Sequence, residues 1–147
     1  MLVRLLYASR ACQPADPALV DDIVATSVAN NPKHGITGVL CYGNGIFMQA
    51  LEGGRTEVSR LYQQIGRDAR HEDVVLLYYE EILEREFAGW AMGLVNTGKV
   101  NMATILKYSA HGELDPYRTS GHASQALLKE LIAGASIVGR TSERHRF

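Results

Sequence analysis

The hydrophobic residues near the amino terminus recur with the period of a β-strand. Val3, Leu5 and Tyr7 share one side of residues 2–7, because successive side chains of a strand point to opposite faces of a sheet. We expect that side to be buried, which points the Tyr7 phenol inward. A loop over residues 9–15 is expected to follow.

The next stretch has the spacing of an amphipathic helix. Asp16 can cap this helix, and Pro17 can occupy its first turn, where the missing N–H group costs nothing. Pro32 disfavours helical geometry at Asn31. Asn30 and Asn31 are therefore predicted to lie at the final turn.

A β-hairpin is the clearest local prediction. Residues 36–42 and 46–51 are rich in apolar and β-branched side chains, and they flank the turn sequence Gly43-Asn44-Gly45. Glu52-Gly53-Gly54 is expected to break the second of these strands.

Three further segments complete the predicted core. Residues 58–65 have helical periodicity, with the helix end expected near Arg67 and Asp68. Residues 74–80 predict a fourth strand, and residues 90–95 predict a short fifth strand after a charge-rich stretch.

This order of elements predicts an α+β fold, a ferredoxin-like sandwich (β-α-β-β-α-β-β) over residues 1–96 with both helices on one face of the sheet. Residues 97–139 are expected to form a C-terminal extension with accessory helices at 102–108 and 124–133. A tail of about 50 residues cannot form its own core, so it must pack on the free face of the sheet or on another subunit. Residues 140–147 are expected to be a flexible, solvated end.

Composition and charge narrow the classes of function. The 147 residues, 46% hydrophobic and 21% charged, fit one folded domain with a helical extension. A net charge of −1 supplies no field that would attract nucleic acid or an anionic membrane, so neither is an expected partner. No signal peptide or membrane-length apolar run is present, which predicts a cytoplasmic protein. Cys12 and Cys41 match no disulfide or zinc pattern and are expected to be reduced thiols.

Common catalytic and metal-binding motifs are missing from the sequence. It contains no nucleophile elbow, P-loop, zinc-protease motif or dinucleotide-binding glycine motif. The histidines lack the spacing of metal ligands, so no metal site is expected. They are His34, His71, His111, His122 and His145.

Gln49 is the unusual polar residue in this pattern. It shares a face with Phe47 and Leu51 in an apolar strand, and a buried amide needs hydrogen-bond partners. Either Gln49 borders a polar ligand or it turns toward an unpacked face. Tyr7 also points inward from a strand and needs a partner, which favours the ligand. Taken singly, both residues, and the two asparagines before the proline, are more often structural.

Six short motifs stand in order along about residues 2–95. They are Arg4-Leu5-Leu6-Tyr7, Asn30-Asn31-Pro32, Gly35-Ile36-Thr37-Gly38-Val39-Leu40, Phe47-Met48-Gln49-Ala50-Leu51-Glu52-Gly53, Asp68-Ala69-Arg70-His71 and Phe87-Ala88-Gly89-Trp90-Ala91-Met92. No single motif is very specific, but together the sequence resembles the BLUF family, sensors of blue light using FAD. The fold predicted above is also the fold of that family.

The resemblance implies that FAD is bound non-covalently, although FMN or riboflavin could satisfy the same ring contacts. It places the flavin ring between the two helices, with Ile23 and Ile65 against its faces and the amide of Asn31 at its polar edge. Arg67 is an alternative to Arg70 as the cation that faces phosphate. The expected flavin contacts are Tyr7, Ile23, Ser27, Asn30, Asn31, Gln49, Ile65, Asp68, Arg70 and His71.

The resemblance also assigns photoactive roles. Tyr7 would donate an electron and a proton to the excited flavin, and Gln49 would bridge the phenol and the ring. Rotation or tautomerisation of the Gln49 amide would reverse whether it presents a hydrogen-bond donor or an acceptor to the flavin. The altered hydrogen bond would shift the absorption of the flavin to the red. Trp90 and Met92 are expected on one face of the predicted fifth strand, where either could approach Gln49. Their exchange there would carry the change to the fifth strand and then to the tail helices.

The expected function is therefore a short, stand-alone blue-light photoreceptor and not an enzyme. Its output would pass to a separate signalling protein or through a change in a homo-oligomer. Two alternatives stay open. One is a flavoenzyme, for which no catalytic pair is evident; the other is a colourless ferredoxin-like binding module with Tyr7 and Gln49 in its core.

Overall fold

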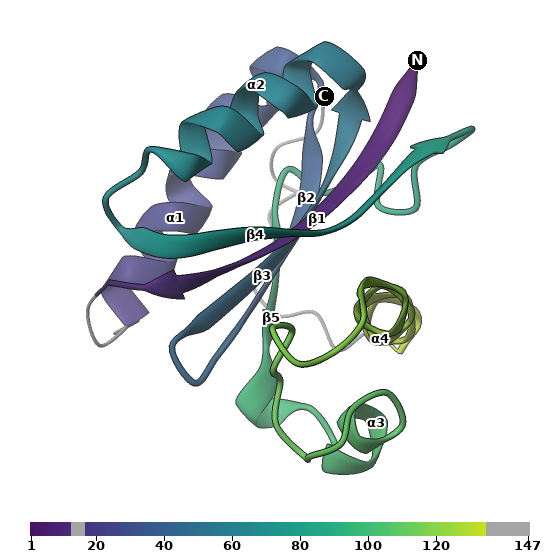
Figure 1. Ribbon diagram of the computed structural model, residues 1–147. Coiled ribbons are helices and arrows are strands. Elements are labelled where there is room, and N and C mark those ends of the chain that lie inside the picture. The colour runs from purple at the N-terminus through teal and green to yellow at the C-terminus, as the bar shows by residue number, and fades with distance from the viewer. Residues whose placement is uncertain (13–16, 135–147) are drawn as a thin grey trace.

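The protein is built on one mixed β-sheet. A computed structural model describes residues 1–12 and 17–134 (Figure 1). Within these residues five strands stand in the order β4-β1-β3-β2-β5, and all neighbours are antiparallel except β2 and β5, which are parallel. The strands are β1 (Leu2–Ala11), β2 (Thr37–Gly43), β3 (Ile46–Gly54), β4 (His71–Ile82) and β5 (Gly93–Asn96).

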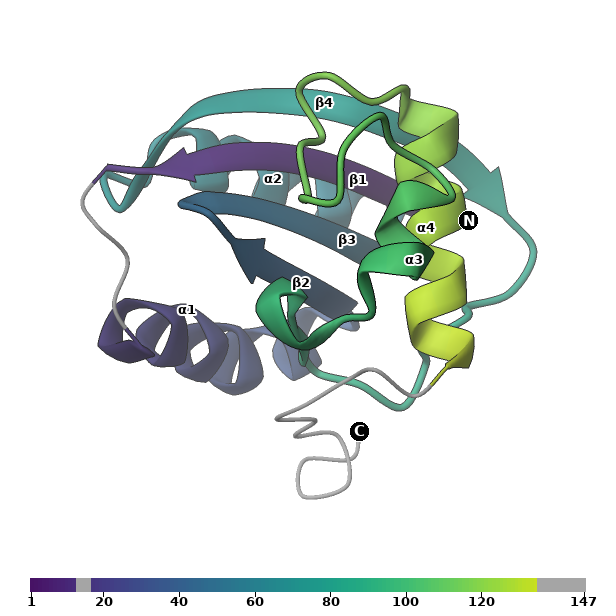
Figure 2. The same ribbon diagram turned by 90° about the horizontal axis from the view of Figure 1, so that it is seen from below.

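Helices cover both faces of this sheet. α1 and α2 lie side by side on one face, and α3 and α4 lie on the other (Figures 1 and 2). The predicted α+β, ferredoxin-like sandwich with an added strand is thereby confirmed. The helical segments are α1 (Pro17–Asn30), the 3-10 turn η1 (Asn31–His34), α2 (Arg55–Gly66), the 3-10 turn η2 (Thr97–Lys99), α3 (Met102–Leu106) and α4 (Gly121–Ala133).

Several element ends differ from the sequence prediction. β1 continues through the predicted loop at Ser9, and β3 continues through Glu52-Gly53-Gly54, because residues 2–10 of β1 pair in register with residues 54–46 of β3. The predicted fifth strand is shorter and starts only at Gly93. Asp16, the predicted cap of α1, and the predicted tail at 140–147 lie outside the described residues.

The face covered by α1 and α2 contains the first hydrophobic cluster. Its buried members are Val3, Leu5, Tyr7, Val20, Ile36, Leu40, Phe47, Leu51, Val58 and Met92. Tyr7 alternates with Leu6, which points to the opposite face, so the inward direction predicted for the phenol is confirmed.

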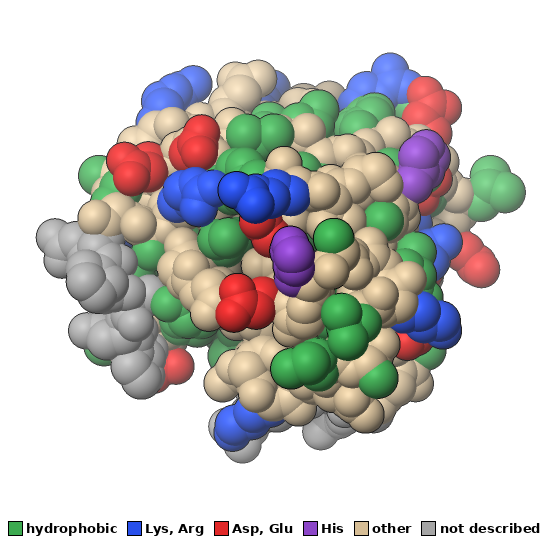
Figure 3. Space-filling model, turned by 60° about the horizontal axis from the view of Figure 1, so that its bottom comes forward, with side chains coloured by type: hydrophobic (Ala, Val, Ile, Leu, Met, Phe, Trp, Pro, Cys, Tyr) green, Lys and Arg blue, Asp and Glu red, His purple; other side chains and the backbone are tan. Residues whose placement is uncertain are grey.

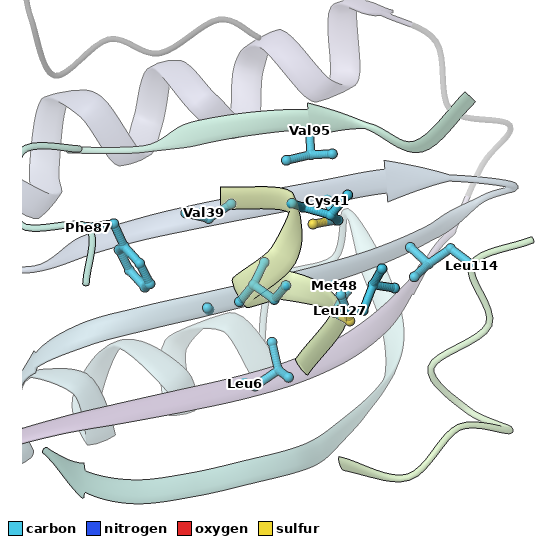
Figure 4. Packing of buried hydrophobic residues seen from close by; sticks show 11 residues of the cluster. Leu6, Val39, Cys41, Met48, Phe87, Val95, Leu114 and Leu127 are labelled. Atoms are coloured by element: carbon cyan, nitrogen blue, oxygen red, sulfur yellow. The ribbon is translucent and has the colours of Figure 1, made fainter. Parts of the chain in front are cut away.

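The face covered by α4 contains the second cluster (Figure 4). Leu127, Leu128 and Leu131 of α4 pack with apolar residues of β1, β2, β3 and β5, so the extension lies on the free face of the sheet. Cys41 is part of this cluster, and burial raises the pKa of its thiol to about 12.

On the outer surface shown in Figure 3, acidic and basic side chains are interspersed. No helix in the described ranges is long and apolar enough to span a membrane.

Candidate functional site

Tyr7 and Gln49 meet across neighbouring strands. They are directly opposite in the pairing of β1 with β3, and each side chain is only 3% exposed. The Tyr7 hydroxyl donates a hydrogen bond to Gln49 Oε1, and Gln49 Nε2 donates to Met92 Sδ at 3.4 Å. Because the Gln49 carbonyl accepts from the phenol, its amide nitrogen is directed toward Met92.

The phenol of Tyr7 keeps its proton at all ordinary pH values. Burial raises the pKa of Tyr7 well above its usual range, the nearby Asp68 and Tyr62 raise it further, and Arg70 opposes them. The ring of Tyr62 lies tilted against that of Tyr7, with 5.6 Å between the centroids. Tyr7 is therefore a fixed donor toward Gln49.

A cavity of about 500 Å³ opens beside this pair, between α1 and α2. A volume of this size lies within the range of roughly 300–1,000 Å³ typical of small-molecule pockets. All ten residues expected to contact a flavin line the cavity. These are Tyr7, Ile23, Ser27, Asn30, Asn31, Gln49, Ile65, Asp68, Arg70 and His71.

Other lining residues were missed in the sequence. They are Thr26, His34, Ile36, Glu57, Arg60, Leu61 and Gln64. Most lie one or two helical turns from a predicted contact, as Thr26 does from Ile23 and Leu61 does from Ile65. The helical period could therefore have identified them as lining residues. Hydrogen bonds to the preceding turn hold two of the predicted side chains, since Ser27 Oγ donates to the Ile23 carbonyl and Asn30 Nδ2 to the Thr26 carbonyl, both at 2.9 Å.

Asn31 joins the cavity to the segment that precedes β5. Its side chain is buried, and Nδ2 donates to the Ala91 carbonyl at 3.2 Å. Its own carbonyl accepts from the Ile36 amide at 3.0 Å, across the turn that Gly35 closes with a φ of 64°. Glycine enters this left-handed region without the steric cost that a Cβ adds, so Gly35 favours the turn that carries Asn31.

Asp68 and Arg70 form a fixed ion pair on the cavity wall. Arg70 Nη2 lies 2.6 Å from Asp68 Oδ2, and the Arg70 backbone amide also donates to Asp68 Oδ1 at 2.9 Å. Hydrogen bonding from Arg70 lowers the pKa of Asp68, so the carboxylate stays charged. Arg67, the alternative cation, is not among the residues found to line the cavity in the described chain.

His71 is anchored by Ser9, a residue that the sequence analysis placed in a loop. Ser9 Oγ and His71 Nδ1 are hydrogen-bonded at 2.7 Å, and Ser9 is fully buried within β1. Burial lowers the pKa of His71, with Asp68 opposing this shift and Arg70 adding to it. The imidazole is therefore neutral near pH 7 and presents its edge to the Tyr7 ring at 6.4 Å.

Trp90 and Met92 do not share a face, so that prediction was wrong. Residues 90–92 precede β5 and bend at Ala91, which removes the strand alternation on which the prediction depended. Met92 is fully buried on the α1/α2 side beside Gln49, whereas Trp90 packs with the cluster under α4 and stacks on Phe87. Met92 Sδ thus contacts Gln49 in this structure.

The side chains around the cavity fit a flavin. Ile23 and Ile65 offer apolar surface from opposite helices, and Gln49 and Asn31 offer amide groups for a polar ring edge. Gln49 donates to a thioether, which is a weak acceptor, so its two N–H groups retain capacity for a ligand. Among the residues that the structure describes, no cluster of acidic, histidine or cysteine side chains could hold a metal ion.

A ferredoxin-like sheet with a cavity between its two helices and a buried Tyr–Gln pair beside it defines a flavin-binding light-sensor domain. A sequence model of the family described as sensors of blue-light using FAD matches residues 2–93. The chain belongs to this BLUF family and is a blue-light sensor that binds flavin.

Solved structures agree with this assignment. BlsA in its photo-activated state superposes with a TM-score of 0.79 at 31% identity, covering 90% of this chain and 95% of BlsA. BlrB, a BLUF protein in its dark state, gives a TM-score of 0.76 at 32% identity and covers 91% and 96%. Both structures are matched over nearly their whole length, so the described fold is that of a BLUF protein.

The curated relatives are much longer proteins. The beta subunit of a photoactivated adenylate cyclase from Euglena longa is 38% identical over 92 residues, which are 62% of this chain and 11% of the relative. The alpha subunit from Euglena gracilis is 38% identical over 104 residues, 71% and 10%. The chain thus spans about a tenth of the length of these relatives.

Proposed function

We propose that the chain binds FAD non-covalently in the cavity between α1 and α2 and detects blue light through Tyr7 and Gln49. The observation that carries this proposal is the buried sequence of contacts from Tyr7 through Gln49 to Met92 at the cavity wall. Ile23, Ser27 and Ile65 would hold the ring, Asn30 and Asn31 would pair with its polar edge, and Asp68, Arg70 and His71 would contact the remaining flavin atoms.

The residues of the chain then perform a proton and hydrogen-bond exchange. When bound, flavin would supply the absorption of blue light and the acceptor for the electron and proton that Tyr7 gives up. Tyr7 releases its phenolic proton along the hydrogen bond to Gln49 Oε1 as it gives up that electron. Gln49, by rotation or tautomerisation, changes which end of its amide faces the cavity, and the altered hydrogen bond shifts the absorption to the red.

The geometry supports the order of these steps. The phenol is held protonated by its burial, so the proton is available only when the ring loses an electron. The Gln49 amide is bound on its nitrogen side by a weak acceptor, so a change of orientation sacrifices little hydrogen-bond energy there. Met92 would be the first side chain displaced by such a change.

The change would pass from Met92 and Trp90 to the extension. We propose residues 1–96 as the sensor domain and 97–139 as the segment that conveys the signal. The receiver would be a separate signalling protein, and the sensor would act as a homo-oligomer in the cytoplasm. The balanced net charge and the mixed charges in Figure 3 argue against nucleic acid or a membrane as the partner.

The test is an absorption spectrum of purified protein before, during and after blue illumination. The wild type is expected to shift reversibly to the red and recover in darkness, whereas Tyr7→Phe and Gln49→Leu are expected to retain flavin without the shift. Tyr62→Phe is the matched control, because Tyr62 contacts the Tyr7 ring without hydrogen-bonding Gln49.

Each alternative has its own outcome. A shift that persists in Gln49→Leu would refute the assigned switch. Bound flavin without any shift in the wild type would indicate the flavoenzyme, and a colourless protein that rejects added flavin would indicate the simple binding module. Chromatography of the released cofactor would distinguish FAD from FMN and riboflavin.

A further inference from the structure

A buried carboxylate on β3 binds the segment that carries Met92. Glu52 is fully buried and lies on the α4 side of the sheet, on the same strand as Gln49. Its oxygens accept from the backbone amides of Glu86, at 3.0 and 3.2 Å, and of Phe87, at 3.2 Å. Two successive backbone N–H groups thus point at one anionic side chain, an arrangement that forms strong, charge-assisted hydrogen bonds.

Arg4 balances the charge of this carboxylate. Its Nε and Nη2 donate to Glu52 Oε2 at 2.8 and 2.6 Å, and its Nη1 donates to Glu80 at 2.6 Å. A buried carboxylate without compensation is strongly unfavourable, so Arg4 accounts for how Glu52 can be buried. Arg4 does not account for the two backbone contacts, which fix the position of the loop rather than its charge.

The loop remains tethered from Phe87 to Met92. The Trp90 amide donates to the Phe87 carbonyl at 3.1 Å, and the Trp90 carbonyl accepts from the Gly38 amide at 3.2 Å. The Ala91 carbonyl accepts from Asn31, and Met92 Sδ accepts from Gln49. The Phe87–Trp90 bond lies within the loop itself, so a displacement at residues 86–87 is passed directly to Trp90, which stands two residues before Met92.

We propose that Glu52 is a positioning residue of the photosensor, which holds the loop by its Glu86 and Phe87 amides and thereby seats Met92 Sδ against Gln49. The photochemical part of this inference rests on the proposed function, whereas the positioning of Met92 does not. Glu86 also links the loop to α4, since its carboxylate lies 3.4 Å from Lys129 Nζ. Glu52 thus anchors the segment that lies between the photoactive pair and the extension.

Glu80 provides a matched control. It binds the same guanidinium at the same 2.6 Å distance as Glu52, but its side-chain hydrogen bonds in the described residues are to Arg4 and Tyr78 and not to the loop amides. The side chain of Glu80 is 32% exposed and that of Glu52 is fully buried, so the two are compared at the loop: if Glu52 serves only to pair with Arg4, neither Glu52→Gln nor Glu80→Gln should release the loop amides. If Glu52 positions the loop, only Glu52→Gln should release it.

The decisive measurement is made in the dark on flavin-loaded protein with ¹³C-methyl-labelled methionine. Met92→Leu identifies the Met92 resonance among those of Met1, Met48, Met92 and Met102. In Glu52→Gln we expect the Met92 methyl signal to move or split, while Met48, on the other face of β3, stays in place. Amide exchange at residues 86 and 87 should accelerate by at least about tenfold with the loss of a charge-assisted bond.

Glu52→Asp tests the same inference without removing the charge. Its shorter side chain keeps the anion beside Arg4 but withdraws it from the loop amides, so the Met92 signal should still move. An unchanged Met92 signal and unchanged exchange in either folded Glu52 variant, or equal effects in Glu80→Gln, would overturn the proposal. Under illumination, both Glu52 variants should change the dark-recovery rate several-fold, while Glu80→Gln recovers at the wild-type rate.

Discussion

Adding a single methyl group at Gly38 should displace Met92 from Gln49. Gly38 lies in β2, beside the segment that leads into β5. A Cβ at this position would lie 2.7 Å from Met92 Cε, 3.0 Å from the Ala50 carbonyl oxygen and 3.3 Å from Leu51 Cδ2. The absence of a side chain at Gly38 is therefore what makes room for the Met92 methyl group.

The size of the effect follows from these distances. Ordinary van der Waals contact begins near 3.4 Å, so the Met92 methyl would have to retreat by roughly 1 Å. Met92 can do this by changing rotamer, but the Ala50 carbonyl belongs to the neighbouring strand and cannot. We expect Gly38→Ala to lower the free energy of unfolding by about 1–2 kcal/mol, the usual cost of an added methyl in a packed core less the backbone entropy that alanine saves.

The assay combines urea unfolding with the light-minus-dark spectrum. Gly38 is not among the residues that line the cavity in the described chain, so flavin should remain bound. The loss of the 3.4 Å Gln49–Met92 contact should change the amplitude of the red shift or the recovery rate. Gly89→Ala is the control, because a methyl there meets no atom within 4 Å.

A double mutant decides whether Met92 is the affected neighbour. Met92→Ala removes the atom with which the new methyl collides, so Gly38→Ala should cost less in that background, by a coupling of about 0.5–1 kcal/mol. Strictly additive stabilities, or a Gly38→Ala protein with a wild-type photocycle, would refute the explanation.

Two further predictions concern stability. Gln125 in α4 is 6% exposed, and neither of its amide atoms has a hydrogen-bond partner among the described residues, so Gln125→Leu should raise the free energy of unfolding by about 1–2 kcal/mol in urea titrations. A loss of stability would contradict this expectation. The pKa of His71 is lower in the folded protein than in the unfolded chain, so as pH falls the unfolded chain binds this proton at a higher pH than the folded protein does. The free energy of unfolding should therefore fall as pH drops below about 6.5, and it should stop falling below the pKa of His71 in the folded protein. His71→Gln should flatten this part of the plot of unfolding free energy against pH, and an unchanged slope would show that other groups titrate there. Asp68 should not interfere, because its pKa in the folded protein lies below its usual 3.8.

The local pattern of the sequence was enough to predict the order of the elements and the inward direction of Tyr7. Strand and helix periods are properties of neighbouring residues, and so is the glycine turn between β2 and β3. The ten expected flavin contacts were named through the family resemblance, and each lies on the cavity. That they touch flavin stays a prediction until the cofactor is observed.

What the sequence could not determine depends on pairing across the sheet. The strand ends at Ser9 and Glu52 are held by neighbouring strands, which outweighed the loop and glycine signals in the local sequence. The bend at Ala91 decided that Trp90 and Met92 lie on opposite faces of the sheet, with Met92 beside Gln49. Glu52 meets amides more than thirty positions away. Such contacts form only when the strands assemble, because they join residues that are far apart in the sequence and are brought together by the tertiary fold.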